Sequence, residues 1–229
     1  MELNIKDITE LLQVPERTVI KWIESGSLPA YRINNQYRFN RSEVNDWILK
    51  NDHRTSSKIL DLSGDRKPVS LVELLTRGGV FHRVPGGTVT EVIRNIAGMI
   101  PLPAGLDRDA VVLSLIEREE LMPTAIGEGM AIPHPRNPII SDMEGESITI
   151  GFLEHSIDYQ AIDGQPVQTL FVVLSANPAR HLEILSKISF LCHQQEFKDL
   201  LASRAAREDV VAYIALKEQE WTRKRAPHG

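Results

Sequence analysis

One histidine of this chain stands in a sequence context that could support chemistry. His134 lies in the run TAIGEGMAIPHPRNP, between Pro133 and Pro135. Because both prolines restrict the backbone, His134 is not expected inside a helix, and its ring is predicted to sit on a rigid bend. Gly127 and Gly129 precede it, and such glycine-rich backbone can turn tightly and present N–H groups to an anion. The segment therefore combines a histidine of fixed orientation with donors for an anion.

A second histidine is predicted near the start of a helix. Asn177 is a favourable N-cap and Pro178 a favourable first helical residue, which places His181 in the first turn. Such a helix end binds phosphate well and keeps a nearby imidazole neutral, and a neutral imidazole nitrogen is a nucleophile. The alternative is a capping or packed residue, since Leu185 and Ile188 share its face.

The elements around these histidines indicate an α/β domain. Short helices with capping boxes come first, two buried apolar strands follow, and helices dominate the end of the chain. This order predicts an α/β sandwich. The predicted elements are helices that begin after Ser70, after Thr88 and near Arg108, strands at residues 148–153 and 170–174, and helices from Pro178 onward.

The first fifty residues follow a different pattern. Apolar residues at helical spacing predict a helix up to Leu12, and Pro15 begins a second helix that Gly26 ends. Two short helices joined by a tight turn form a helix-turn-helix. Alternation on both sides of Asn34-Asn35 predicts a β-hairpin, here called the wing (residues 31–39). A last amphipathic helix is expected at Val44, Trp47 and Ile48.

This segment resembles the winged-helix DNA-binding domains of the excisionase and MerR class over nearly all of residues 3–50. The resemblance rests on the run LLQVPERTVIKWIESGSLPAYRINNQYRFNRSEVNDWI. Basic side chains there can contact phosphate and guanine edges, although Glu16 and Glu24 would repel phosphate. A protein-interaction or dimer module is the alternative. The DNA-contacting residues that the resemblance implies are Arg17, Thr18 and Lys21 in the major groove, with Arg32 and Arg38 at phosphate or the minor groove.

The longer part of the chain resembles the enzyme IIA domain of the phosphoenolpyruvate-dependent sugar phosphotransferase system, in its fructose/mannitol and nitrogen-regulatory form. The resemblance runs from about Leu71 to Ala215 and rests on LIERE, which contains Arg118, followed by TAIGEGMAIPHPR. It implies an α/β sandwich with a mixed central sheet flanked by helices.

The same resemblance implies roles for three residues. His134 would accept a phosphoryl group from a phosphohistidine on an HPr-like carrier, Arg118 would supply charge, and His181 would hydrogen-bond the phosphoryl oxygens. No cofactor or metal is implied, because the donor is already a phosphohistidine. Alternatives remain: a structural role for His134, and a surface i,i+4 partner for Arg118. A zinc site at His134 and His181 lacks further ligands.

Composition fits two parts with different partners. Apolar residues make up 42% of the 229 residues and the net charge is −5, with the negative charge lying beyond the first seventy residues. No apolar run approaches the roughly 20 residues that span a bilayer, and the start of the chain is unlike a signal peptide. With Cys192 as the single cysteine, a cytoplasmic protein is expected. The predicted division is a winged helix at 1–50, a linker at 51–69 and an enzyme IIA-like domain at 70–229.

Together these features predict a regulator that combines DNA binding with phosphorylation on His134. One alternative is a phosphocarrier that passes phosphate onward in sugar uptake, although this chain shows no permease or IIB-like cysteine segment. Another is a phosphorylation-silent interaction module. A homodimer is expected by analogy, because small winged helices usually read paired half-sites.

Overall fold

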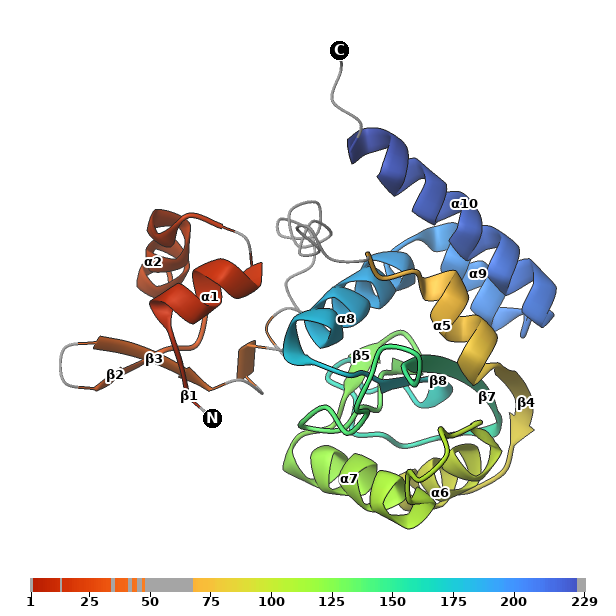
Figure 1. The fold of residues 1–229 in the computed structure, drawn as a ribbon. Coiled ribbons are helices and arrows are strands. Elements are labelled where there is room, and N and C mark those ends of the chain that lie inside the picture. Colours follow the sequence, from red (N-terminus) through yellow and green to blue (C-terminus); the bar gives the residue numbers. More distant parts are fainter. Residues whose placement is uncertain are drawn as a thin grey trace. The chain divides into compact units, whose positions relative to one another are not determined.

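The structure is a computed structural model that describes residues 2–12, 14–33, 36–40, 43, 44, 47 and 68–225. Contacts divide the chain into two compact units, Met1–Val69 with Ala179–Phe190, and Ser70–Pro178 with Leu191–Gly229. Figure 1 shows the helices and strands of both units. None of the helices in the described ranges has both the length and the apolar character needed to cross a membrane.

The first unit contains the predicted helix pair and wing. Helix α1 (Ile5–Leu12) is followed by α2 (Glu16–Glu24), and strands β1 (Glu2–Asn4), β2 (Tyr31–Ile33) and β3 (Gln36–Asn40) form an antiparallel sheet in the order β1-β3-β2. The sequence predicted that α2 begins at Pro15. In the structure Pro15 is the N-cap, and the first helical residue is Glu16. Gly26 follows the C-cap with φ of +68°, a conformation that suits glycine. Asn34 and Asn35 lie outside the described residues, as does Ile48 of the predicted last helix.

The helix pair and the sheet share one apolar core. Its members are fully or almost fully buried. Trp47 is one of them, and its ring lies 5.0 Å, between centroids, from the ring of Trp22, which is partly buried against the core. Leu182, from helix α8 (Pro178–Cys192), belongs to the same cluster. The other buried members are Leu3, Ile8, Leu12, Val14, Val19, Leu28, Phe39, Val44 and Trp47.

The second unit is built on a five-stranded mixed sheet in the order β4-β7-β8-β6-β5. The β4–β7 and β6–β8 pairs are parallel, whereas β7–β8 and β5–β6 are antiparallel. The predicted mixed sheet flanked by helices is therefore confirmed. The strands are β4 (Val80–Val84), β5 (Ala125–Gly127), β6 (Met130–Ala131), β7 (Ser147–Ile157) and β8 (Val167–Leu174).

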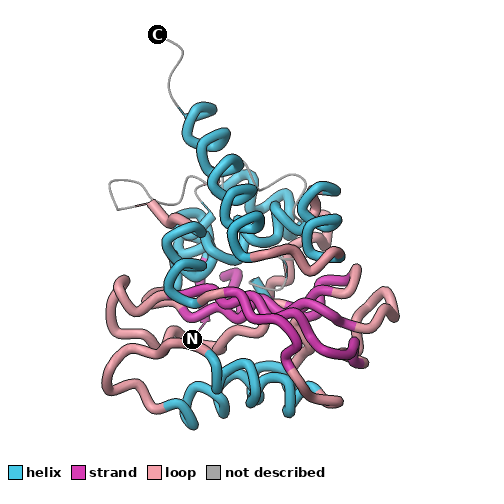
Figure 2. Tube along the Cα trace, turned by 90° about the vertical axis from the view of Figure 1, so that its right-hand side faces the viewer, coloured by secondary structure: helices cyan, strands magenta, loops and turns pink. Residues whose placement is uncertain are grey.

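Helices cover both faces of this sheet, as Figure 2 shows. Helices α6 (Val89–Met99) and α7 (Arg108–Leu121) pack on one face, and α5 (Leu71–Gly78), α9 (Gln195–Ala202) and α10 (Arg207–Arg225) lie on the other (Figure 1). The predicted helix starts are confirmed, because Ser70 and Thr88 are N-caps whose hydroxyls accept hydrogen bonds from the N–H groups of Glu73 and Glu91. Both predicted buried strands are present, as parts of β7 and β8.

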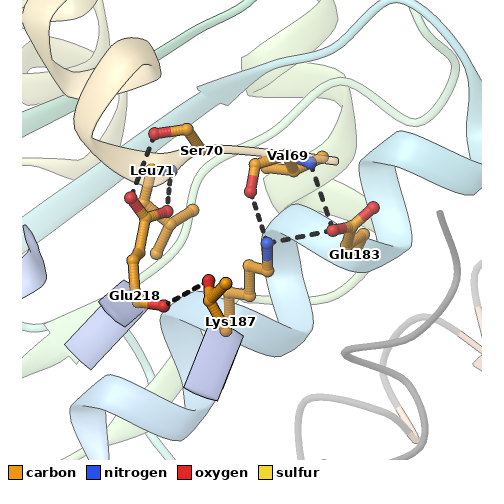
Figure 3. Close-up of polar contacts among 7 residues, drawn as sticks. Val69, Ser70, Leu71, Glu183, Lys187 and Glu218 are labelled. Atoms are coloured by element: carbon orange, nitrogen blue, oxygen red, sulfur yellow. Dashed lines mark hydrogen bonds and ion pairs between the residues drawn. The ribbon is translucent and has the colours of Figure 1, made fainter. Parts of the chain in front are cut away.

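The chain enters α5 through residues 69–71, whose backbone groups and the Ser70 hydroxyl make hydrogen bonds with charged side chains (Figure 3). Within the first unit, the Val69 N–H donates to Glu183 and its carbonyl accepts from Lys187. The side chains of Glu183 and Lys187 form an ion pair of 2.9 Å and are 3% and 5% exposed. Within the second unit, Glu218 of α10 accepts the Ser70 hydroxyl at 3.0 Å and the Leu71 N–H. These contacts fix the backbone where the predicted linker ends.

Candidate functional site

His134 lies on a non-regular loop directly after β6, as its two flanking prolines predicted. The side chain is fully buried. Its Nδ1 is 2.7 Å from the carbonyl oxygen of Ile132. Since a carbonyl oxygen can only accept, Nδ1 must carry the proton, and the lone pair of the neutral ring then resides on Nε2. The ring is thus held in one tautomer and one orientation.

Backbone hydrogen bonds anchor this loop on two sides. The Ile132 N–H donates to the Thr124 carbonyl at 3.1 Å, and the Val173 N–H of β8 donates to the Pro133 carbonyl at 2.9 Å. The loop therefore continues the β6 edge of the sheet past the end of the strand. These two hydrogen bonds therefore hold the backbone next to His134 in a fixed position relative to the sheet.

A buried carboxylate supports the loop from behind. Glu119 of α7 accepts the Thr124 N–H at 2.8 Å and also the Thr124 hydroxyl. Burial raises the pKa of the Glu119 carboxyl, against the lowering effects of the Thr124 hydrogen bonds and of Arg118. A continuous chain of hydrogen bonds thus runs from Glu119 through Thr124 and Ile132 to His134. The roles of Glu119 and Thr124 were not predicted from the sequence, because only their tertiary contacts reveal them.

The predicted tight turn precedes this loop at Gly127 and Gly129, which have φ of +90° and +75°. The backbone N–H of Glu128, between these glycines, does serve an anionic group, but that group is a carboxylate of the protein itself. The Glu128 N–H donates to the Asp163 carboxylate at 2.7 Å, and the Glu128 side chain pairs with Lys198 at 2.7 Å. This part of the turn is fixed by protein groups.

Arg118 lies near the same loop. A groove of about 560 Å³ is lined by Arg118 and Glu117 of α7 together with Pro135 and Arg136, which follow His134. Arg118 is only 2% exposed and donates from Nη1 to the Met122 carbonyl at 2.6 Å. The alternative of a surface i,i+4 partner is therefore wrong. The structure instead brings Arg118 to the groove beside the histidine loop.

His181 occupies the first turn of α8, which begins at Pro178 as predicted. Its side chain is 5% exposed. By its contacts His181 belongs to the first unit, whereas His134 and Arg118 belong to the second.

The residues expected to contact DNA occupy one helix and the wing. On α2, Arg17 and Lys21 are exposed one turn apart, with Thr18 half-buried between them. In the wing, Arg32 is exposed, and its guanidinium lies 5.9 Å from the centre of the Tyr37 ring.

Arg38 is half-buried, and its Nη2 donates to the Gln36 amide oxygen at 2.9 Å. Because Arg32 pairs with Tyr37 and not with Arg38, the two wing arginines lie on opposite faces of the hairpin. The exposed residues of α2 therefore lie on one face of that helix. The two wing arginines lie on opposite faces of the β2–β3 hairpin.

Comparison with known proteins identifies both parts of the chain. Residues 73–217 match the model of the phosphoenolpyruvate-dependent sugar phosphotransferase system EIIA 2 family. Residues 2–52 match a helix-turn-helix domain model. The first match spans all of α8, so by sequence this helix belongs to the EIIA domain.

Similar proteins cover the same region. A nitrogen regulatory protein of Pseudomonas aeruginosa is 33% identical, over 61% of this chain and 91% of that protein. The fructose-specific EIIABC component of Bacillus subtilis is 28% identical, over 64% of this chain but 23% of that protein. The crystal structure of nitrogen regulatory protein IIA-Ntr from Neisseria meningitidis has a TM-score of 0.53 at 23% identity, covering 62% of this chain and 94% of that one, and thus shares the fold.

Proposed function

This chain belongs to the phosphoenolpyruvate-dependent sugar phosphotransferase system EIIA 2 family, and we propose that it is a DNA-binding regulator phosphorylated on His134. The observation that carries this proposal is the hydrogen bond from His134 Nδ1 to the Ile132 carbonyl. It leaves the nucleophilic lone pair on Nε2. The phosphoryl donor is a phosphohistidine on an HPr-like carrier.

The proposed step is a direct transfer between two imidazoles. The Nε2 lone pair of His134 attacks phosphorus, a new N–P bond forms, and the carrier's N–P bond breaks with its electrons returning to the carrier's imidazole. No net oxidation or reduction occurs. Catalysis then consists of positioning and of stabilising charge on the three equatorial oxygens. The Ile132 carbonyl, which accepts the hydrogen bond from Nδ1–H, stabilises the positive charge that develops on the ring as Nε2 bonds to phosphorus.

The groove beside the loop supplies charge for those oxygens. Arg118 and Arg136 both line it, and both carry guanidinium groups suited to phosphoryl oxygens. We assign to His181, in the first turn of α8, a hydrogen bond to the phosphoryl group. Arg118 therefore acts as a charge-stabilising residue, and His181 as a hydrogen-bonding one.

Burial of the His134 ring adds a condition. A fully buried Nε2 cannot meet a protein-bound phosphohistidine until neighbouring groups move aside. This burial is also the specific observation that favours a second candidate, an EIIA fold that serves only for contacts and is not phosphorylated.

Intact-protein mass after incubation with phosphoenolpyruvate, enzyme I and an HPr-like carrier separates the two candidates. We expect one acid-labile phosphoryl group on the wild type and none on His134→Ala. His155→Ala, which changes an exposed histidine elsewhere in the second unit, is the matched control and stays phosphorylated. An unmodified wild-type protein with several competent carriers would favour the contact module.

We further propose that the helix-turn-helix domain binds duplex DNA through Arg17, Thr18 and Lys21, with Arg32 and Arg38 of the wing. The exposed, one-turn spacing of Arg17 and Lys21 on α2 supports this surface. Filter binding at increasing salt tests it, because neutralised phosphates give a negative slope of log affinity against log salt.

Two substitutions sharpen the DNA assay. Arg17→Ala should weaken binding and, if Arg17 contacts phosphate, reduce the salt slope by about 1. Arg94→Ala, an exposed arginine on α6, is the matched control and leaves the slope unchanged. Absence of salt-dependent binding to any duplex would contradict the DNA proposal.

Regulation requires that the two activities communicate. A phosphoryl group adds about −1.5 to −2 charges, which would alter DNA affinity or a partner contact. DNA binding measured before and after phosphorylation tests this, and equal affinities would indicate an onward phosphocarrier role instead. We place this regulator in the cytoplasm, as a homodimer on paired half-sites, with residues 1–50 as the DNA-binding domain and 70–229 as the EIIA domain.

A further inference from the structure

Helix α8 is common to the two units of the chain. Its ends, Pro178 and residues 191–192, are counted with the second unit, whereas Ala179–Phe190 between them are counted with the first. The EIIA family match at residues 73–217 includes the whole helix. Because an uninterrupted helix is a stiff element, a displacement of one end moves the side chains along it together.

Three successive residues in the first two turns of α8 have different tasks. His181 is the histidine assigned to the phosphoryl group, and Leu182 is 1% exposed within the apolar core of the helix-turn-helix. Glu183 accepts the Val69 N–H at 3.2 Å, and Lys187, one turn further on, donates to the Val69 carbonyl (Figure 3). The same stretch of helix therefore contacts both the core of the helix-turn-helix and the end of the linker.

The apolar core of the helix-turn-helix depends on this helix. Leu182 is the member that comes from outside residues 1–50, among the described members of the cluster. A unit of about 50 residues buries a small share of its surface and is only marginally stable alone. Withdrawing a buried leucine from such a core leaves a cavity that destabilises it. The helix-turn-helix is thus sensitive to where α8 lies.

We propose that α8 transmits phosphorylation of His134 to the helix-turn-helix, through Leu182 in its core and Glu183 at the end of the linker. This inference rests on the proposed function, in which His181 hydrogen-bonds the phosphoryl group. That hydrogen bond draws the first turn of α8 toward the phosphoryl group and Leu182 out of the core. The helix-turn-helix loosens, and its affinity for DNA falls.

Tryptophan fluorescence can follow this core in the full chain. The chain has three tryptophans, and two of them, Trp22 and Trp47, have ring centroids 5.0 Å apart at the core of the helix-turn-helix. The third, Trp221, lies on α10. In a Trp221→Phe protein the remaining tryptophan emission therefore reports on the helix-turn-helix alone.

The first measurement tests the contact without phosphorylation, in the Trp221→Phe background. Leu182→Ala should shift the emission to longer wavelength, because the indoles gain contact with water. Leu185→Ala is the matched control, since Leu185 is fully buried on the same helix but is not among the described members of the cluster. Leu182→Met, which nearly conserves volume, should keep the parent emission. Circular dichroism checks that each variant is folded, and identical emission of Leu182→Ala and its parent would overturn the inference.

The second measurement adds the phosphoryl group. The Trp221→Phe protein is phosphorylated with phosphoenolpyruvate, enzyme I and an HPr-like carrier, and its emission and its affinity for mixed-sequence duplex DNA are compared with those of the unmodified protein. We expect the emission to shift to longer wavelength and the affinity to fall about tenfold, a usual size for coupling between two sites. With Leu182→Ala added, intact mass should still show the phosphoryl group, but both responses should be lost. Leu182→Met should respond as its parent does.

The outcomes separate this inference from the proposed function. If the phosphorylated protein keeps its DNA affinity, or if Leu182→Ala responds as its parent does, the inference fails and the phosphoryl-transfer proposal stands. A protein that gains no mass overturns the phosphoryl-transfer proposal and the inference with it, whereas the contact of Leu182 with the core is still decided by the first measurement.

Discussion

Two buried glutamates of this protein are almost equally hidden from solvent but have different surroundings. Glu183 is 2% exposed and has the Lys187 ammonium at 2.9 Å, and together they hold both backbone groups of Val69. Glu119 is 6% exposed, receives hydrogen bonds from Thr124 and also interacts with the hydroxyl of Tyr159. The first carboxylate is neutralised within an ion pair of 2.9 Å. For the second, the charge of Arg118 lowers the pKa, but burial raises it by more.

This difference teaches what each network is suited to do. The Glu183–Lys187 network is suited to holding the backbone in place. Breaking the pair is costly, because either partner left alone would be an unpaired buried charge. A carboxylate supported mainly by hydroxyl and amide donors stays sensitive to pH, because burial raises its pKa. The Glu183 network fixes the point where the linker meets the EIIA domain, and the Glu119 network lies behind the loop that carries His134.

The largest expected effect comes from breaking the ion pair. Lys187→Met leaves Glu183 buried without its cation, and we expect a loss of about 3 to 5 kcal/mol in the free energy of unfolding. Urea unfolding, followed by tryptophan fluorescence and by circular dichroism, measures it. In the double variant Lys187→Met with Glu183→Leu, most of the loss should be recovered, since an apolar pair of similar volume is tolerated. A single variant as stable as the wild type would show that the pair contributes nothing.

The next effect tests the Glu119 network through its hydroxyl. Thr124→Val removes one donor from the buried carboxylate while keeping the shape, and we expect a loss of about 1 to 3 kcal/mol. Thr149→Val is the matched control, because Thr149 is fully buried and its hydroxyl has no hydrogen-bond partner in the described part of the chain. Removing that hydroxyl should be neutral or stabilising.

The same variant pair has a functional readout. If the Thr124 contact positions the His134 loop, Thr124→Val slows phosphorylation of His134, and Thr149→Val does not. Equal phosphorylation rates in the two variants would confine the Glu119 network to a structural role.

A third prediction concerns pH. Burial raises the pKa of Glu119 above its ordinary value of 4.5 in the folded state. A raised folded pKa contributes stability that is fully present below the unfolded pKa and is lost as pH rises through the folded pKa. Wild-type stability should therefore fall from about pH 4.5 upward, by at most about 1.4 kcal/mol per pH unit from this group.

Glu119→Gln removes this titration and should flatten that part of the profile. Glu144→Gln, which changes an exposed carboxylate, should retain the wild-type slope. Parallel profiles for wild type and Glu119→Gln between pH 4.5 and 7 would contradict the assignment.

Some of these structural features could be predicted from the sequence alone, and others could not. The predicted buried strands at 148–153 and 170–174 were found because continuous apolar runs are visible locally, and the bend at His134 was found because prolines restrict their neighbours. Strands β4, β5 and β6 were not predicted. Strand β4 is partly exposed without strict alternation, and β5 and β6 span only three and two residues, so their pairing and not their composition makes them strands.

The polar networks show the same limit. Glu119 looks like any charged residue of an amphipathic helix, and Glu183 and Lys187 look like a surface i,i+4 pair. Their burial depends on segments far away in sequence, such as Val69, which lies 114 residues from Glu183. Local patterns could predict the caps of α5 and α6, but not which cap would be joined to another helix.

That last distinction gives the smallest expected effect. Ser70 and Thr88 both cap helices by accepting an N–H three residues on, but Ser70 also donates its hydroxyl to Glu218 of α10 at 3.0 Å. Ser70→Ala and Thr88→Ala should each cost about 1 kcal/mol for the lost cap. The Glu218 contact should add about 0.5 to 1.5 kcal/mol at Ser70 only. In Glu218→Gln protein, whose amide offers weaker acceptance, the difference between the two alanine variants should shrink, and an unchanged difference would show that the excess at Ser70 comes from the cap and not from α10.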